Sequence, residues 1–580
     1  MLSSLNPVPG FPDYTGPYKV GTVDVEIPVS DLHAPSPRPD NADHILSVAF
    51  RIFYPASLES KNRGDKATWL PMPQRQHISS YTKFVGAGPV LAEVLSYLPR
   101  HLHYTSIPAY KNADILPANT PNGRWPTVIF SHGLGGSRNA YSHVAGSLAS
   151  HGTVVICPEH RDGSAVTSFI RNPEKHRQLQ EQKRSSSPRP TRFFARSASN
   201  PKNVVVPYRR ISHNVSPEMY AAREEQLRVR MWEMGLVHEA VLSLDRGDKV
   251  TNMNVSTLSL DPFVGMMHVH EPGSIIFAGH SFGSATTVQF VKSTYYADHP
   301  ALRQMDKAPL FTPEPGSEIR RQITEKTATI LLDIWVTPLI DPGFTPLFNL
   351  PMPAYADTPD APGGKAILSV LSDQFYKWEE HLRATARVLS PCPAHEVQSA
   401  ELYKRSDPSL PPFPEPNFFY VQESAHLSQS DFGILFPWLT KKMFSAVEPE
   451  RAIRLNLRAQ LQFLRENGVP VARTCGMDLA DGVSADAVFV EESSEKNKQK
   501  KKGGKGDLVD DRAILDKSGE GLVDHWVWID SVALFAGSDS ESESVEGTDK
   551  NKRRVERTDR DMAEHLEPGL EEAAVVSSRG

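Results

Sequence analysis

The sequence has few cysteines, no long apolar runs and little net charge. Cys157, Cys392 and Cys475 are the only cysteines among 580 residues, and no CxxC pair is present. A disulfide framework or a cysteine-based zinc site is therefore not expected, and a reducing compartment is favoured. No stretch approaches the roughly 18 apolar residues of a membrane-spanning helix. A net charge of −6 gives no reason to expect nucleic acid as a partner.

The first ten residues have neither a basic start nor an apolar segment of the kind found in signal peptides. With the absence of a spanning segment, this predicts an intracellular, cytoplasmic protein. The 48 prolines are many for a folded chain and predict additional loops and disordered appendages.

Strand-like and helix-like segments alternate along most of the chain. Alternating runs at 18–27 and 46–54 predict antiparallel strands that open a mixed sheet. A long helix is predicted over 217–244, with Ser216 as its N-cap and Pro217 in its first turn. Buried-type strands are predicted at 127–130, 153–157, 275–278, 328–333, 366–371 and 418–421, and further helices at 144–150 and 453–464. This order predicts an α/β fold with a mostly parallel central sheet covered by helices on both faces.

We expect one folded domain over residues 10–490, followed by a low-complexity charged tail over 491–580. Within the tail, 520–536 is apolar enough to dock as a late strand, and Lys496–Lys505 is a solvated charge run or, alternatively, a nuclear address. Residues 171–210 carry eleven Lys or Arg against two Glu and are rich in Ser and Pro, which predicts a flexible basic insertion. The alternative is a patch that holds the protein near anionic lipid. A helix predicted over Pro89–Leu98 packs in the core or forms a lid.

The motif most informative about chemistry is Gly279-His280-Ser281-Phe282-Gly283. It follows the apolar run at 275–278 and precedes a small-residue helix start. This order is typical of the nucleophile elbow of an α/β-hydrolase, in which the serine occupies a sharp, strained turn. We therefore predict Ser281 as a nucleophile, the alternative being an ordinary Gly/Ser turn.

A serine nucleophile needs a histidine base and an acid that orients this base. In this fold the chain order is Ser, acid, His, so both partners must follow Ser281. His426 lies just past the last predicted strand, whereas the other late histidines have no strand before them (His299, His381 and His395). For the acid, Asp333 and Asp373 both follow predicted strands, and position alone leaves the choice between them open.

Two backbone N–H groups are needed to stabilise the oxyanion of the transition state. Phe282, directly after the nucleophile, is predicted to supply one. The glycine-rich loop after the strand at 127–130 is predicted to supply the other, from Leu134. A phosphate-binding loop is excluded there because no Gly-Lys-Ser/Thr sequence follows.

Several motifs together resemble the calcium-independent platelet-activating factor acetylhydrolase family, over roughly residues 10–470. The resemblance rests on six segments, which are Gly16-Pro-Tyr-Lys-Val-Gly, Val128-Ile-Phe-Ser-His-Gly-Leu-Gly, Leu148-Ala-Ser-His-Gly, Glu159-His-Arg-Asp-Gly-Ser-Ala, Gly279-His-Ser-Phe-Gly-Ser-Ala-Thr and Leu332-Asp-Ile-Trp-Val-Thr-Pro-Leu. It implies a triad of Ser281, Asp333 and His426, and thus favours Asp333 over Asp373. It also supports the Leu134 and Phe282 amides as oxyanion donors.

The resemblance further implies a phospholipid substrate with a short or oxidised sn-2 acyl chain, and no metal or cofactor. The chain departs from the secreted members in lacking a signal peptide, in having Ser284 where a third glycine often occurs, and in its charged tail. Glu159–Asp162 is expected to brace the loop after its strand, the alternative being that Arg161 meets a lipid headgroup.

The sequence thus predicts a serine esterase that cleaves the sn-2 ester of platelet-activating factor-like phospholipids. One alternative is a general carboxylesterase or lipase with the same triad. Another is a non-catalytic hydrolase fold that binds partners through its basic insertion and tail, against which the complete Ser/Asp/His set argues. Contact with a membrane surface is a further expectation.

Overall fold

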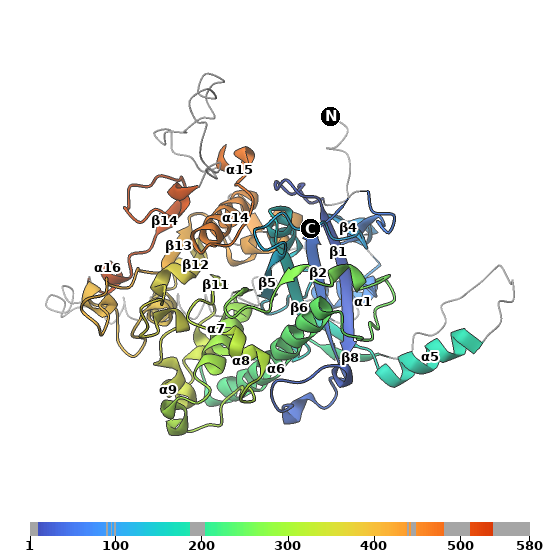
Figure 1. Cartoon of the computed structure of the whole chain (residues 1–580), viewed down its shortest axis with the longest axis horizontal. Helices are drawn as coiled ribbons and strands as arrows, with labels where there is room; N and C mark the ends of the chain where they lie inside the picture. Colours follow the sequence, from blue (N-terminus) through green and yellow to red (C-terminus); the bar gives the residue numbers. More distant parts are fainter. Residues whose placement is uncertain are drawn as a thin grey trace, which may run out of the picture.

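A mixed β-sheet runs through the centre of the computed structural model (Figure 1). The structure describes residues 10–57, 59–86, 88, 91–93, 96–97, 100–185, 203–437, 440–441, 448–480 and 511–536. Over these residues the sheet has twelve strands in the order β14-β13-β12-β11-β10-β5-β6-β2-β1-β4-β3, with β9 paired to β5. The strands are β1 (Val20–Pro28), β2 (Ser47–Pro55), β3 (Lys66–Thr68), β4 (Ser106–Lys111), β5 (Trp125–Ser131), β6 (Val154–Glu159), β9 (Met267–His268), β10 (Ile275–His280), β11 (Thr329–Leu332), β12 (Ile367–Ser372), β13 (Asn417–Val421) and β14 (Trp526–Trp528).

The strand directions agree with the prediction of a mostly parallel sheet. From β6 through β5, β10, β11 and β12 to β13, every neighbouring pair is parallel. The predicted antiparallel opening is also confirmed, since β1 pairs with β2 from Val20 opposite Pro55 to Pro28 opposite Ser47. Carboxyl ends of parallel strands meet at one edge of a sheet, and ligands bind there in open α/β sheets.

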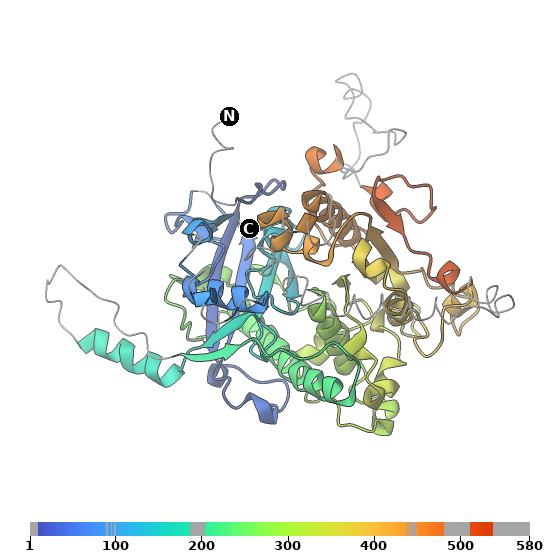
Figure 2. The same ribbon diagram turned by 180° about the vertical axis from the view of Figure 1, so that it is seen from behind.

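Helices cover both faces of the sheet (Figures 1 and 2). Ile275 and Phe277 of β10 belong to the core that includes the long central helix, whereas Ile276 and Ala278 belong to the core on the other face. This alternation is what the period-2 geometry of a strand buried on both faces requires. The helices are α1 (Gln74–Phe84), α3 (Arg100–Tyr104), α4 (Ser142–Ser150), α5 (Pro173–Ser185), α6 (Pro217–Arg246), α7 (Phe282–Tyr295), α8 (Glu318–Gln322), α9 (Thr345–Phe348), α10 (Asp373–Tyr376), α11 (Glu379–Leu389), α12 (Asp431–Leu435), α14 (Pro449–Glu466), α15 (Gly476–Ala480) and α16 (Ser531–Ala536).

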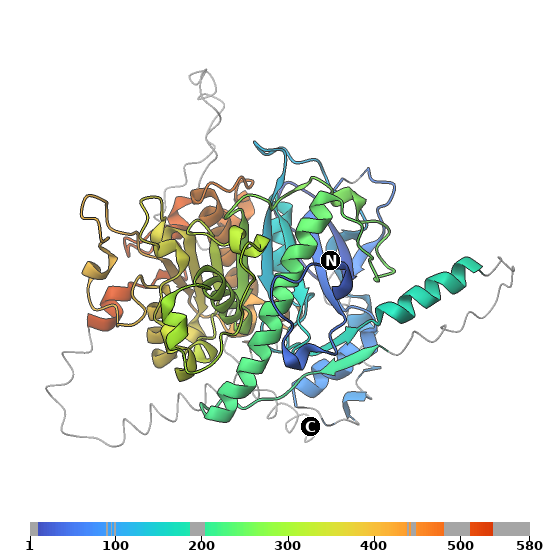
Figure 3. The same cartoon turned by 60° about the horizontal axis from the view of Figure 1, so that its bottom comes forward.

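Helix α6 is the long helix predicted from the sequence, and it crosses the molecule diagonally in Figure 3. The Ser216 side chain accepts a hydrogen bond from the Met219 amide, and Pro217 occupies the first turn, as predicted. Helix α6 packs with α7 on one face of the sheet, and α4 packs with α14 on the other. These two layers, with the sheet between them, form the three-layer α/β-hydrolase architecture.

Part of the predicted basic insertion over 171–210 is helical. Residues 173–185 form helix α5, which projects away from the sheet in all three views of the chain. Asn172 accepts a hydrogen bond from the Lys175 amide, and Glu174 pairs with Arg177 one turn later. Such local capping and i,i+3 pairing stabilise a helix that has little apolar surface to bury. After the stretch that is not described, β8 (Val204–Pro207) pairs antiparallel with β7 (Thr167–Ile170).

The segment predicted to dock as a late strand contains β14. Residues 526–528 form β14, which adds antiparallel to β13 at the edge of the sheet. Much of the helix predicted over 89–98, the cluster at 496–505 and the tail beyond 536 lie outside the described residues. Among the described helices, none combines the length and the apolar character needed to cross a bilayer.

Candidate active site

Ser281 lies on a strained turn between β10 and α7. Its backbone has φ 56° and ψ −121°, a conformation that L-residues rarely adopt. A Cβ added at Gly279 would strike the backbone of Gly283, and a Cβ at Gly283 would strike the backbone of Ser131 in β5. Glycine is therefore required at both flanks for helix, turn and neighbouring strand to approach so closely.

The structure places His426 beside Asp333, at the carboxyl ends of β13 and β11. The ring Nδ1 of His426 lies 2.9 Å from Oδ2 of Asp333, and Oδ1 of Asp333 accepts a hydrogen bond from the Ser372 amide at 2.5 Å. Asp373, the other acid left open by the sequence, instead pairs with Lys377 at 2.6 Å. Geometry thus separates two carboxylates that position along the chain could not separate.

The His426 ring is held between two other rings. It stacks on Phe375 at 4.4 Å with an interplanar angle of 8°, and on His280 at 4.4 Å with an angle of 30°. Its backbone N–H donates to the side-chain oxygen of Gln374. These contacts fix the plane of the imidazole before any substrate binds.

Burial perturbs both members of this pair. It raises the pKa of Asp333 to about 7 and lowers the pKa of His426 to about 3. The cause in each case is the cost of holding a charge away from water. The Asp333–His426 pair therefore resists the second proton, the one that would give the pair a net positive charge.

The predicted oxyanion loop approaches the serine closely. A Cβ on Gly133 would lie 3.0 Å from the Cβ of Ser281. Tyr141 fixes this loop, since its hydroxyl accepts from the Gly133 amide at 3.1 Å and donates to Nδ1 of His280 at 2.7 Å. Within the described chain, the N–H groups of Leu134 and Phe282 have no protein acceptor. Two free amides thus flank Ser281, one from the loop and one from the first turn of α7, where helix N–H groups have no intrahelical partner.

A buried arginine that the sequence reasoning missed supports both sides of this arrangement. Arg230 of α6 donates to the carbonyl of His132 at 2.9 Å, and its guanidinium lies 4.5 Å from the ring centroid of Phe282. Its carboxylate partner is Asp162, at 3.1 Å. No local pattern in the sequence marks Arg230, because its partners lie 56 to 99 residues away along the chain.

The Glu159–Asp162 motif, predicted to brace the loop after its strand, is tied to the neighbouring strands. Arg161 is 1% exposed and donates to the Ser47 carbonyl at 2.9 Å, with Glu26 at 3.5 Å. The alternative of a headgroup contact by Arg161 is wrong, since this side chain is enclosed by protein.

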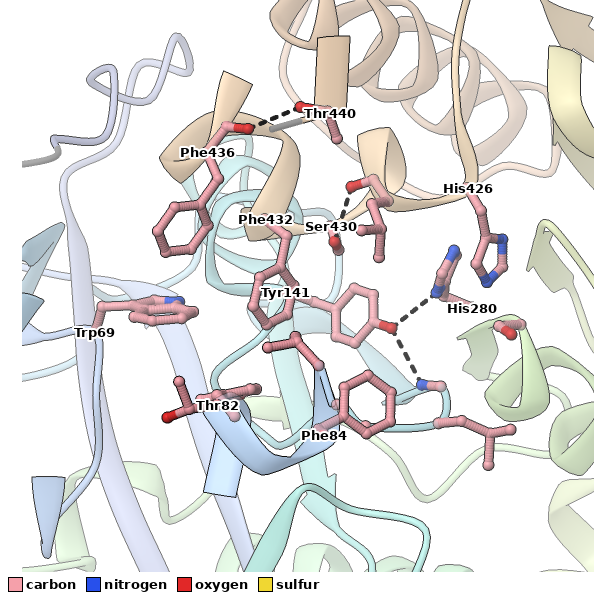
Figure 4. A pocket seen from close by; sticks show the side chains of 18 of the residues that line it. Trp69, Thr82, Phe84, Tyr141, His280, His426, Ser430, Phe432, Phe436 and Thr440 are labelled. Atoms are coloured by element: carbon pink, nitrogen blue, oxygen red, sulfur yellow. Dashed lines mark hydrogen bonds between the residues drawn. The ribbon is translucent and has the colours of Figure 1, made fainter. Parts of the chain in front are cut away.

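Ser281, His280 and His426 open onto one cavity of about 320 Å³ (Figure 4). Figure 4 shows aromatic side chains extending from the two histidines toward Trp69. Small-molecule sites are typically of this size and largely apolar, with a few convergent polar groups. The lining includes Leu70, Ile78, Tyr81, Phe84, Leu102, Leu134, Trp335, Phe432 and Phe436.

His280, Asp333 and His426 offer possible metal-ligand atoms within 4.8 Å of one another. However, Nδ1 of His426 and Oδ2 of Asp333 already share a hydrogen bond, and Nδ1 of His280 accepts the Tyr141 hydroxyl. An ion bound through Nδ1 of His426 and Oδ2 of Asp333 would have to break the first of these bonds. The cluster therefore fits a hydrogen-bonded acid–base pair better than a metal centre.

Comparison with known proteins identifies the family of this chain. Residues 4–346 match the model of the family "Platelet-activating factor acetylhydrolase, isoform II". The chain belongs to this family. The family resemblance seen in the sequence motifs is thereby confirmed, and membership assigns the chain to the carboxylic ester hydrolases that act on phospholipids.

Individual relatives are distant. The chain is 26% identical over 480 residues to "Putative phospholipase A2" of Schizosaccharomyces pombe, a match that covers 79% of this chain and 92% of the relative. It is 27% identical over 278 residues to "Platelet-activating factor acetylhydrolase" of Cavia porcellus, covering 48% and 51% of the two chains. Among solved structures, a ferulic acid esterase from Streptomyces cinnamoneus is similar with a TM-score of 0.39 at 15% identity, covering 78% of this chain and 92% of the esterase.

Proposed function

We propose that this member of the family is a serine esterase that hydrolyses the sn-2 acetyl, short or oxidised acyl ester of platelet-activating factor-like phospholipids. The observation that carries the proposal is the hydrogen-bonded His426–Asp333 pair in the same cavity as the strained Ser281. A serine hydroxyl becomes nucleophilic only when a neighbouring imidazole accepts its proton.

In the proposed reaction, Ser281 Oγ attacks the ester carbonyl carbon while His426 takes the hydroxyl proton. Asp333 keeps the proton of His426 on Nδ1, so that Nε2 is free to act as the base. The Leu134 and Phe282 amides stabilise the negative charge that develops on the carbonyl oxygen. His426 then protonates the departing lysophospholipid oxygen, and a water molecule activated by His426 cleaves the acyl-enzyme to release the carboxylate.

The test is turnover of a short-chain phosphatidylcholine by the full-length protein and by Ser281→Ala, with covalent labelling by a fluorophosphonate in parallel. We expect turnover and labelling in the wild type and neither in the variant. Turnover that survives Ser281→Ala would contradict the proposal. Failure of the wild type to label would instead favour a non-catalytic binding protein.

A second candidate, a general carboxylesterase or lipase with the same triad, is favoured by one observation. The cavity wall beyond the histidines is almost entirely aromatic and aliphatic, more apolar surface than an acetyl group can cover. Each methylene that a substrate buries contributes about 0.8 kcal/mol, or roughly fourfold in kcat/KM. A panel of phosphatidylcholines that differ only in the sn-2 chain separates the candidates, since the proposed enzyme should lose activity with long unmodified chains and a lipase should gain it.

A further inference from the structure

The two amides assigned to the oxyanion come from elements far apart in the sequence, and one buried side chain connects these elements. Arg230 is fully buried and does not line the cavity. On the loop side, its Nη1 donates to the His132 carbonyl at 2.9 Å, two residues before Leu134. On the helix side, the same nitrogen donates to Oγ1 of Thr286 at 3.2 Å, in the first turns of α7.

A second set of bonds reaches the loop through Ser164. Nη2 and Nε of Arg230 lie 2.7 and 3.0 Å from Oγ of Ser164. The carbonyl of Ser164 in turn accepts the Gly135 amide at 2.8 Å. The loop is thus held by the same guanidinium on both sides of Leu134. Asp162, itself buried, balances the charge at 3.1 Å.

We propose that Arg230 is a positioning residue that fixes the Leu134 and Phe282 amides relative to each other. This inference rests on the proposed function, because it assumes that both amides stabilise an oxyanion formed at Ser281. Stabilisation of this kind requires donors held within about 0.5 Å of the productive geometry. A guanidinium suits the task because its five N–H groups form a rigid planar fork, whereas a lysine ammonium is a point charge on a flexible stem.

The experiment compares Arg230→Lys, which keeps the charge but loses the fork, with the wild-type full chain. The substrates are p-nitrophenyl acetate and its thionoester, whose sulfur accepts hydrogen bonds poorly. Misplacing a reacting or stabilising group by about 1 Å can cost roughly 100-fold. We therefore expect kcat for the oxoester to fall about 100-fold with little change in KM. The thionoester rate should fall much less, so the preference for the oxoester shrinks.

Arg458→Lys is the matched control. Arg458 is also buried, lies on α14 and pairs with Asp511 at 2.6 Å. Helix α14 packs on the face of the sheet opposite α6 and α7, so this replacement should leave kcat and the oxoester preference unchanged. Thermal melting of both variants measures how much stability is lost when a buried arginine is replaced, so that this loss can be separated from an effect on kcat.

If Arg230→Lys does not fold, Thr286→Val decides the question. This change is close to isosteric and removes one acceptor of Arg230 on α7. Loss of one hydrogen bond predicts about a fivefold fall in kcat for the oxoester, again with a smaller fall for the thionoester. An unchanged oxoester preference in the variant that folds overturns the inference, whether or not overall activity falls. Absence of Ser281-dependent turnover in the wild type would be the separate failure of the proposed function.

Discussion

Replacement of Asp333 by asparagine tests the acid assignment, because the structure dictates how the amide must orient. Asp333 is fully buried and accepts two hydrogen bonds, one from the Ser372 amide and one from Nδ1 of His426. Asparagine has only one acceptor oxygen. The backbone N–H of Ser372 can only donate, so the asparagine oxygen must face it and the NH₂ group must face His426. The imidazole then carries its proton on Nε2, where it cannot accept a proton from Ser281.

We expect Asp333→Asn to lower kcat about 10⁴-fold, which is the effect of the corresponding change in serine proteases. This corresponds to about 5.4 kcal/mol of barrier. Asp373→Asn is the matched control, since this carboxylate pairs with Lys377 and should change kcat by less than about threefold. Both variants are assayed with a short-chain phosphatidylcholine, and a melting curve checks the fold. Near-normal turnover by Asp333→Asn with loss of turnover by Asp373→Asn would refute the reasoning.

Three further outcomes follow from the geometry. Burial raises the pKa of Asp333 to about 7, so kcat/KM should fall as the pH is lowered through about 7. The reason is that a proton taken up by the Asp333–His426 pair removes the base. A pH–rate profile that stays flat down to pH 5 would contradict this expectation. Gly135→Ala should abolish most activity and lower the stability of the fold, since Gly135 has φ 65° and an added Cβ would strike the ring of Phe84. Gly123→Ala is the control: Gly123 has a similar φ of 69° but open space around it, so the substitution should lower stability by only about 1 kcal/mol without loss of activity. Denaturation and turnover measure the two effects. Ser216→Ala should destabilise the protein by about 1 kcal/mol through loss of the α6 cap while leaving kcat unchanged, and equal unfolding midpoints would show that the cap contributes nothing.

Features encoded within a few residues could be predicted from the sequence. The glycines around Ser281, the cap at Ser216 and the apolar strand runs each act locally, and the structure has them where the pattern indicated. The same local signals were present at Asn172 and Pro173, where a capped helix starts, but the Ser, Pro and charge content of the following residues outweighed them. Composition described the segment as a whole and missed the helix within it.

Contacts between distant elements could not be predicted in this way. Asp333 and Asp373 both follow strands, so position along the chain left the choice open and only the family resemblance favoured Asp333, the carboxylate that faces His426 in the structure. Arg230 lies in the middle of helix α6, and the sequence of this helix is equally compatible with a buried or an exposed arginine at that position. The Tyr141 hydroxyl likewise joins the oxyanion loop to His280 across 139 residues, a link with no period or spacing to reveal it.

The antiparallel addition of β14 to β13 has a consequence for shortened versions of the protein. Without the segment around Trp526–Trp528, the Phe418 carbonyl and the Gln422 amide, which now bond to Ile529 and His525, would be left open at the margin of the sheet. Such a margin is a template for recruiting another chain. Truncation of the chain near residue 490 to remove its charged end would thus also remove the strand that covers this edge. A purified fragment of that kind should aggregate under conditions in which the intact chain remains in solution.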